Sequence, residues 1–341
     1  MNFNKNIFIA AMVAAFLYPP LAIAETQKFD FKAIQESAHQ GNANTQFMLG
    51  YIYAKGKGIP QDHVKAVEWY RKAAEQGNID AQLQLGQLYE QGQGVPQSNT
   101  KANEWYRKAA EQGVDIAQII IAELYFYGDG VQQDYIKATE WFRKAAEQGN
   151  ADAQYKLGWM YSNGQGIPQD YAKAVEWYHQ AAEQDNADAQ YNLGLMYSNG
   201  QGIPQDYAKA VEWYRKATEK GKVSAQVNLG LMYANGQGVP QDYAKAAELY
   251  RKATEQGDSH AQYNLGILYV DGNGVPQNYT QAAALFRKAA DQGNSDAQYN
   301  LATLYYEGKG VPQNINIAKQ WYRKAADQGN SWAKNFLDGL Q

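Results

Sequence analysis

The sequence predicts an all-α protein made of eight stacked helix-turn-helix repeats of 36 residues. The first observation is a Leu-Gly dipeptide that recurs with this period, as Leu49-Gly50, Leu85-Gly86, Leu157-Gly158, Leu193-Gly194, Leu229-Gly230 and Leu265-Gly266. A fixed period of this length indicates stacked copies of one unit that cannot bury its apolar face alone. The second observation is that apolar residues recur at helical spacing within each copy, without alternating strand patterns.

The first helix of each repeat is represented by residues 150–163. Asn150 can cap this helix, because its side chain can accept hydrogen bonds from free amides of the first turn. The residues between Ala153 and Tyr161 include an apolar stripe at helical spacing. Gly158 would cost about 1 kcal/mol relative to alanine in mid-helix. Its recurrence, with alanine instead at Ala122 and Ala302, predicts that a neighbouring helix needs the space.

The second helix is represented by residues 171–184, after a break at Gly164-Gln165-Gly166-Ile167-Pro168. Asp170 is expected to cap it, and a glycine such as Gly149 ends it in the left-handed conformation. Asp185 departs from this rule. Ion pairs on a solvated outer face are expected at Glu68-Lys72, Glu104-Lys108, Glu140-Lys144, Glu212-Lys216 and Glu248-Lys252.

The ends of the array are predicted to carry capping helices. Eight full copies start at Gly41, preceded by a lone second helix over Phe29–Gln40 and followed by a lone first helix over Ser331–Leu340. No linker or composition break interrupts the array. We therefore expect one continuous domain over residues 25–341.

Residues 1–24 have the pattern of a secretory signal peptide. Lys5 precedes an apolar run over Ile7–Leu17, and Ala22-Ile23-Ala24 predicts cleavage before Glu25. The run is shorter than the roughly 20 residues of a transmembrane helix. The alternative is a short helix that the mature protein retains. We expect a periplasmic or secreted protein with no membrane span after signal removal.

Composition argues against several classes of function. The chain has no cysteine, which excludes disulfides, thiolate metal sites and cysteine nucleophiles, and its formal charge of −4 comes without a basic run that would attract nucleic acid. No two of its four histidines share a repeat, so no metal site is expected. The Ser98-x-x-Lys101 pattern is explained by the repeat, since Ser98 occupies the helix-capping position. We predict no catalytic residue and no cofactor, and hence a protein that is not an enzyme.

The full pattern resembles the Sel-one-like repeat, a relative of the tetratricopeptide repeat. It stands here as Ala81-Leu85-Gly86-Tyr89, then Gly92-Gly94-Val95-Pro96-Gln97, then Ala102-Trp105-Tyr106-Arg107-Lys108-Ala109-Ala110-Glu111-Gln112-Gly113. The resemblance implies a right-handed α-solenoid with first helices lining the concave side. It also implies adaptor or scaffold work, with bacterial members associated with envelope processes and host contact. Residues 114–149 depart from the pattern, with Ala122, Gln132 and Ile119-Ile120-Ile121 at repeat positions.

Aromatic residues on the first helices are the candidate binding residues, because tyrosine and tryptophan combine a large contact area with a polar tip. The candidates on the concave face are Phe126, Tyr127, Tyr155, Trp159, Tyr191, Leu195, Tyr263 and Tyr299. The alternative is that several of them pack against the next repeat. A second set occupies one repeat position and is expected in the core: Trp69, Trp105, Trp141, Trp177, Trp213 and Trp321.

Two functions follow as expectations. The first is a non-enzymatic scaffold or adaptor of the bacterial cell envelope that holds a protein or peptide partner on its concave face. The second is a direct binder of cell-wall glycan or of a host factor.

Overall fold

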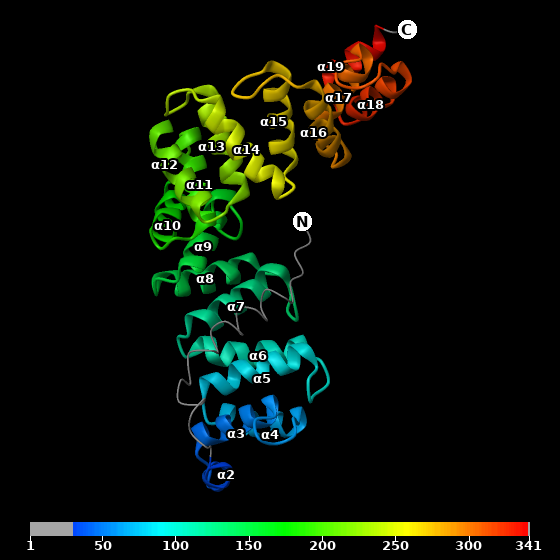
Figure 1. The fold of residues 1–341 in the computed structure, drawn as a ribbon. Coiled ribbons are helices and arrows are strands. Elements are labelled where there is room, and N and C mark those ends of the chain that lie inside the picture. The colour runs from blue at the N-terminus through cyan, green and yellow to red at the C-terminus, as the bar shows by residue number, and fades with distance from the viewer. Residues whose placement is uncertain (1–29, 340–341) are drawn as a thin grey trace. The chain divides into compact units, whose positions relative to one another are not determined.

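The computed structural model describes residues 30–339, and all regular secondary structure within this range is helical (Figure 1). The helices are α2 (Phe31–His39), α3 (Ala43–Lys55), α4 (His63–Glu75), α5 (Ile79–Gln91), α6 (Asn99–Glu111), α7 (Asp115–Tyr127), α8 (Tyr135–Glu147), α9 (Ala151–Asn163), α10 (Tyr171–Glu183), α11 (Ala187–Asn199), α12 (Tyr207–Glu219), α13 (Val223–Asn235), α14 (Tyr243–Glu255), α15 (Ser259–Asp271), α16 (Tyr279–Asp291), α17 (Ser295–Glu307), α18 (Ile315–Asp327) and α19 (Ser331–Asp338). Eight helix pairs, α3/α4 to α17/α18, are thus flanked by one helix at each end. The predicted all-α solenoid is confirmed. The proposed signal peptide, residues 1–24, lies outside the described residues.

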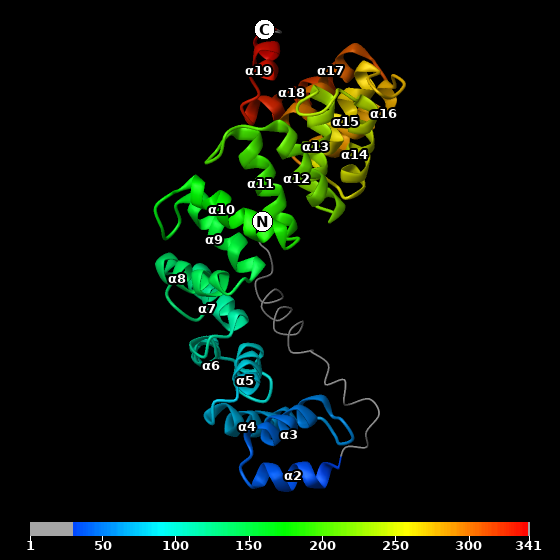
Figure 2. The same cartoon turned by 90° about the vertical axis from the view of Figure 1, so that its left-hand side faces the viewer.

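The chain divides into two compact units, Met1–Trp177 and Tyr178–Gln341, with the boundary inside α10. In the first unit α3, α5 and α7 each pack against the second helix of their own repeat and against the helix that precedes it, as α5 does with α6 and α4 (Figure 1). In the second unit α13, α15 and α17 pack in the same way (Figure 2). First and second helices therefore alternate along each unit. No helix within residues 30–339 has the length and apolar character needed to cross a bilayer.

The helix boundaries follow the expected caps. The Asn150 side chain accepts hydrogen bonds from the amides of Asp152 and Ala153, both at 3.1 Å, and α9 ends at Gly164 with φ of 65°. Asp170 accepts from the amide of Lys173 at 3.1 Å, so α10 starts where predicted. The divergent repeat also keeps this geometry, because α7 and α8 each have the usual 13 residues.

The centre of each repeat is a fully buried ring of the second helix that packs on the first helix. The rings are Tyr70, Tyr106, Phe142, Tyr178, Tyr214, Tyr250, Phe286 and Tyr322, each at most 1% exposed. The mid-helix glycine of the first helix faces this ring, since a β-carbon on Gly230 would lie 2.5 Å from Cε1 of Tyr250. The prediction that a neighbouring helix needs this space is confirmed.

The repeated tryptophans lie one residue before these rings, at the edge of the core. Trp213 is 9% exposed, whereas Trp141 is only half-buried. A lysine three residues later lies over five of these six indole rings, with Nζ of Lys216 at 4.1 Å from the Trp213 centroid. After Trp177 this position holds Gln180. These lysines include four of those predicted to pair with glutamate: Lys72, Lys108, Lys144 and Lys216. The prediction of those four ion pairs was therefore wrong.

The fifth predicted ion pair does form. Nζ of Lys252 lies 2.7 Å from Oε1 of Glu248. In this repeat Leu249 stands where six of the other repeats carry tryptophan, and the seventh has Leu285. A lysine with no indole ring to cover is left free to bind the carboxylate.

A buried glutamine in each first helix ties successive repeats together. Nε2 of Gln82 donates to the Ala74 carbonyl of the preceding repeat at 3.1 Å, and Nε2 of Gln112 donates to Oε1 of Gln82 at 2.8 Å. We call this row the glutamine ladder: Gln46, Gln82, Gln118, Gln154, Gln190, Gln226, Gln262 and Gln298, all at most 5% exposed. Buried amides of this kind are stabilising only when they are hydrogen-bonded.

Candidate functional site

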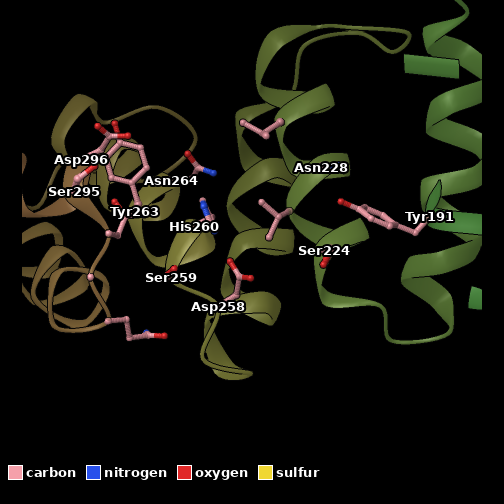
Figure 3. Close-up of a pocket in the computed structure, with 15 residues that line it drawn as sticks. Tyr191, Ser224, Asn228, Asp258, Ser259, His260, Tyr263, Asn264, Ser295 and Asp296 are labelled. Atoms are coloured by element: carbon pink, nitrogen blue, oxygen red, sulfur yellow. The ribbon is translucent and has the colours of Figure 1, made fainter. Parts of the chain in front are cut away.

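The second unit contains a hollow of about 800 Å³ that is lined by its first helices. Tyr191 of α11 lies on one side, and Tyr263 of α15 and Asp296 of α17 lie on the other, with His260 and Asn264 between them (Figure 3). We call this hollow the Tyr191–Tyr263 pocket. Its lining residues are Tyr191, Ser224, Val227, Asn228, Leu231, Asp258, Ser259, His260, Tyr263, Asn264, Gln292, Gly293, Asn294, Ser295 and Asp296.

The pocket lies where one repeat departs from its neighbours. Three residues before the mid-helix glycine position, the repeats of this unit carry Tyr191, Val227, Tyr263 and Tyr299. The Tyr191 and Tyr263 rings pack on the buried rings of Tyr214 and Phe286, both at 6.0 Å between centroids. Val227 is buried but has only a short side chain. The missing phenol ring leaves space between the two tyrosines.

Polar amides form the wall of the pocket. Asparagine follows the tyrosine position in four successive repeats, as Asn192, Asn228, Asn264 and Asn300. Asn192 donates to the Asp188 carbonyl at 2.8 Å, Asn300 to the Asp296 carbonyl at 2.9 Å, and Asn228 to the Tyr214 hydroxyl at 3.4 Å. Asn264 is half-buried, and its side-chain amide has no hydrogen bond to any residue of the described range.

The charge of the pocket is negative. Asp258 and Asp296 contribute carboxylates, His260 is the remaining titratable lining residue besides the tyrosines, and neither lysine nor arginine is present. Burial raises the pKa of Tyr191, a hydrogen bond with Asn228 lowers it, and the Asp258 charge raises it further. The pKa of Tyr263 is likewise raised, mainly by burial and then by the Asp296 charge, against a hydrogen bond with Asn300. Both phenols therefore stay neutral, and each faces an aspartate.

The structure separates the predicted binding residues of the second unit. Tyr191 and Tyr263 line the pocket, whereas Leu195 and Tyr299 do not. Leu195 is half-buried, and the Tyr299 ring packs on Tyr322 at 5.6 Å. The alternative prediction was that these side chains pack against the next repeat. The rings of Tyr191, Tyr263 and Tyr299 do pack on another ring, but that ring belongs to their own repeat.

The predicted residues of the first unit gather at the C-terminal end of α7 and on α9. The Phe126 ring lies 5.7 Å from Trp159 and 5.0 Å from Tyr127, both in edge-on contact. Tyr127 is 40% exposed. Tyr155 is half-buried on α9. Phe126, Tyr127 and Trp159 form an aromatic patch, and neither they nor Tyr155 are part of the pocket.

Sequence reasoning missed the polar lining of the pocket. Asn228, Asn264, Asp258, His260 and Asp296 were not among the predicted binding residues. The available signal was the asparagine that recurs beside the tyrosine position, whereas no repeated feature marked Asp258 or His260. Ser98 caps α6 by accepting from the Lys101 amide at 3.3 Å, as its position predicted. Within residues 30–339 no group of three or more His, Cys, Asp or Glu is placed to hold a metal ion.

Comparison with known proteins places the chain among helical repeat proteins. The family model described as Sel1 repeat matches eight consecutive segments that together cover residues 43–330. A crystal structure of c5321, a protective antigen of uropathogenic Escherichia coli strains with an SLR fold, is 40% identical with a TM-score of 0.84, over 92% of this chain and 67% of that one. A Sel1 repeat protein from Oxalobacter formigenes is 33% identical with a TM-score of 0.74, over 97% of this chain and 100% of that one. None of the curated proteins matches the chain.

Proposed function

Since the chain belongs to the Sel1 repeat family, whose members are generally protein-interaction scaffolds, we propose that it is a non-enzymatic scaffold that holds an extended peptide segment of a partner protein. One observation carries the proposal: four successive first helices contribute to a single hollow that contains an unpartnered amide. A peptide backbone offers donors and acceptors along its length. The Asn264 amide, which has one acceptor and two donors, suits such a backbone.

The pocket has the general features of a recognition site. Ligand sites are concave, contain apolar and aromatic walls, and place a few polar groups that fix the ligand's orientation. Val227, Leu231 and the two tyrosine rings supply apolar surface, and the amides and carboxylates supply the polar groups. Four successive repeats contribute residues to this wall, so an extended chain can contact several repeats at once.

We further propose that the protein works in the bacterial cell envelope, periplasmic or secreted. The signal-like pattern of residues 1–24 supports this. The similarity to an antigen of uropathogenic strains also supports it, because an antigen must meet the host's antibodies. Intact-mass measurement of the exported protein tests the location, and a mature chain that begins at Glu25 is the expected result.

The partner is tested by pull-down from envelope extract with the mature chain, followed by overlapping peptides of any captured protein. We expect a single segment to bind, and a Tyr191→Ala, Tyr263→Ala double variant to lose it. A double variant that binds the segment as well as the natural chain would contradict the proposal.

A direct glycan binder is the second candidate. Tyrosine rings beside amides and carboxylates, as in this pocket, also suit sugar rings, which present both apolar faces and hydroxyls. Sedimentation of the mature chain with purified cell wall, with no captured protein, would favour this candidate. Binding of a host factor is tested by the same pull-down and overlapping peptides, with host extract in place of envelope extract.

A further inference from the structure

The pocket exists because one residue is shorter than its equivalents, and this also explains the free amide within it. Asn228 donates to the Tyr214 hydroxyl at 3.4 Å and Asn300 to the Asp296 carbonyl at 2.9 Å, and the two amides also lower the pKa values of the preceding repeats' tyrosines, Tyr191 and Tyr263. The position that corresponds to Tyr191 and Tyr263 for Asn264 is 227, where the chain has valine and offers no phenol. Val227 therefore both opens the hollow and leaves the Asn264 amide available to a ligand.

The charges around this amide decide which ligand fits. Asp258 caps α15 by accepting from the Ala261 amide at 2.8 Å, so its carboxylate is fixed at the pocket wall. Asp296 accepts from Nδ2 of Asn330 at 3.0 Å. Neither carboxylate has a lysine or arginine partner among residues 30–339. Lys222 of the neighbouring repeat is paired with Asp188, and its Nζ lies 6.0 Å from the centroid of the Tyr191 ring.

Resting on the proposed peptide-binding function, we propose that the Tyr191–Tyr263 pocket holds an arginine or lysine side chain of the bound segment. The negative charges of Asp258 and Asp296 on the pocket wall attract the cationic group. The stem of the side chain packs on the ring of Tyr263, because an aromatic ring attracts cations as well as apolar groups. The Asn264 amide binds the backbone of the same residue.

The polarity of the pocket distinguishes this ligand from others. An acidic side chain would meet two carboxylates without a counter-ion and would be repelled. A neutral sugar would leave both carboxylates without charge compensation. A cationic side chain satisfies them, and charge-assisted hydrogen bonds are about twice as strong as neutral ones.

The test uses capped single amino acids as probes of the full mature chain, followed by NMR of side-chain amides. We expect N-acetyl-arginine methylamide to shift the Asn264 amide signals in a saturable way. Its uncharged counterpart N-acetyl-citrulline methylamide, which has nearly the same shape, should bind about tenfold more weakly, a loss of about 1.4 kcal/mol. N-acetyl-glutamate methylamide should give no shift.

Two aspartate variants test the carboxylates without removing the fold. Asp258→Asn keeps a capping side chain, since asparagine caps as well as aspartate, and Asp296→Asn keeps the size of the residue. Each should weaken binding of the arginine probe about five- to tenfold. Asp271→Asn removes an exposed charge of α15 outside the pocket and serves as the matched control.

A third variant closes the pocket while strengthening the repeat. Val227→Tyr restores the residue found in the neighbouring repeats and gives Asn264 a phenol partner. Binding of the arginine probe should fall by at least about tenfold, while the thermal midpoint stays equal or rises. Loss of binding then cannot be attributed to unfolding.

Other outcomes separate this inference from the proposed function. Equal binding of the citrulline and arginine probes, or no shift by either, overturns the cationic pocket, even if a partner peptide binds elsewhere on the first helices. Shifts with chitotriose but not with the arginine probe overturn it in favour of a sugar site. Unchanged arginine binding in Val227→Tyr shows that the probe binds outside this pocket and also overturns it.

Discussion

A β-carbon added to Gly230 would lie 2.5 Å from Cε1 of Tyr250, closer than packed carbon atoms allow. The same contact recurs between Gly86 and Tyr106 at 2.5 Å. Each repeat therefore forms around one buried ring, which lies directly against the helix backbone where the first helix carries glycine. Because protein cores are packed to nearly crystalline density, the ring has no other space into which it could move if a β-carbon were added.

Gly230→Ala should destabilise the protein, although alanine is the better helix former. Helix propensity favours the variant by about 1 kcal/mol, but the clash with Tyr250 costs about 1–3 kcal/mol. Urea unfolding of both proteins measures the difference. In a Tyr250→Leu background, the ring is gone and the same change should become neutral or stabilising. A stabilised single variant would show that the ring moves aside freely.

The buried carboxyl of Glu90 predicts a dependence of stability on pH. Glu90 is 8% exposed and accepts a hydrogen bond from the Tyr106 hydroxyl at 3.0 Å. Burial raises its pKa above the ordinary value, and the Tyr106 hydrogen bond offsets this only partly. Because the folded-state pKa is raised, ionisation costs more in the folded than in the unfolded protein. The cost is absent at pH below 4.5, the ordinary value, and grows as pH rises through the folded-state pKa.

Glu90→Gln should therefore raise stability at pH 7 and not at pH 4. Glutamine keeps an oxygen that accepts from Tyr106 but carries no charge. The gain at pH 7 should be on the order of 1 kcal/mol, the scale of a single favourable substitution. Urea midpoints at the two pH values measure it, with the exposed Glu75→Gln as control. An identical change at both pH values would refute the assignment to burial of charge.

A substitution at Leu249 should decide whether Lys252 contacts the Glu248 carboxylate or an indole ring. Hydrogen bonding to Lys252 lowers the pKa of Glu248. In Leu249→Trp, the lysine should move onto the indole as Lys216 does, and the pKa of Glu248 should rise toward 4.5. Titration of the Glu248 carboxyl by NMR measures this. Leu249→Met supplies no ring and should leave the pKa low, so a rise in both variants would disprove the exchange.

Much of the fold could be predicted because each repeat contains local sequence signals for where its helices begin and end. Asn150, Asp170 and Gly164 fix helix ends through caps and backbone conformation, which depend on few residues. Burial of the second-helix ring also follows from a repeated position. Four of the five predicted glutamate–lysine pairs do not form, because residue spacing on a helix cannot reveal a competing indole surface beside the lysine.

The site was less predictable because it arises from a difference between repeats. Tyr191 and Tyr263 were found by their residue type, but the pocket depends on the shorter Val227 between them. A missing ring has no signal in a search for aromatic residues. Asn264 has no phenol of the preceding repeat beside it because position 227 is valine. Position 227 belongs to another helix and becomes a neighbour of Asn264 only after folding.

The last prediction concerns the junction at Asp185, which replaces the usual glycine. Asp185 has φ of 65°, whereas Gly257 at the equivalent position has φ of 86°. Its carboxylate pairs with Nζ of Lys220 at 2.9 Å. Lys220 in turn stands where other repeats carry the glutamine that donates to the glutamine ladder, so Oε1 of the buried Gln190 has no hydrogen-bond partner in the described chain.

Asp185→Gly combined with Lys220→Gln should stabilise the protein by about 2 kcal/mol. The left-handed conformation at this position costs a residue with a β-carbon about 1 kcal/mol, and glycine adopts it without this cost. The new glutamine can donate to Gln190, as Gln256 donates to Gln226 at 3.2 Å, and satisfying a buried acceptor contributes about 1 kcal/mol. The lost ion pair is exposed on both sides and contributes little. Urea unfolding of the two single variants and the double variant measures each term. Asp185→Ala loses the ion pair but keeps the β-carbon, so it should be less stable than the natural protein; if it gains as much as Asp185→Gly, backbone strain at this junction is not the cause.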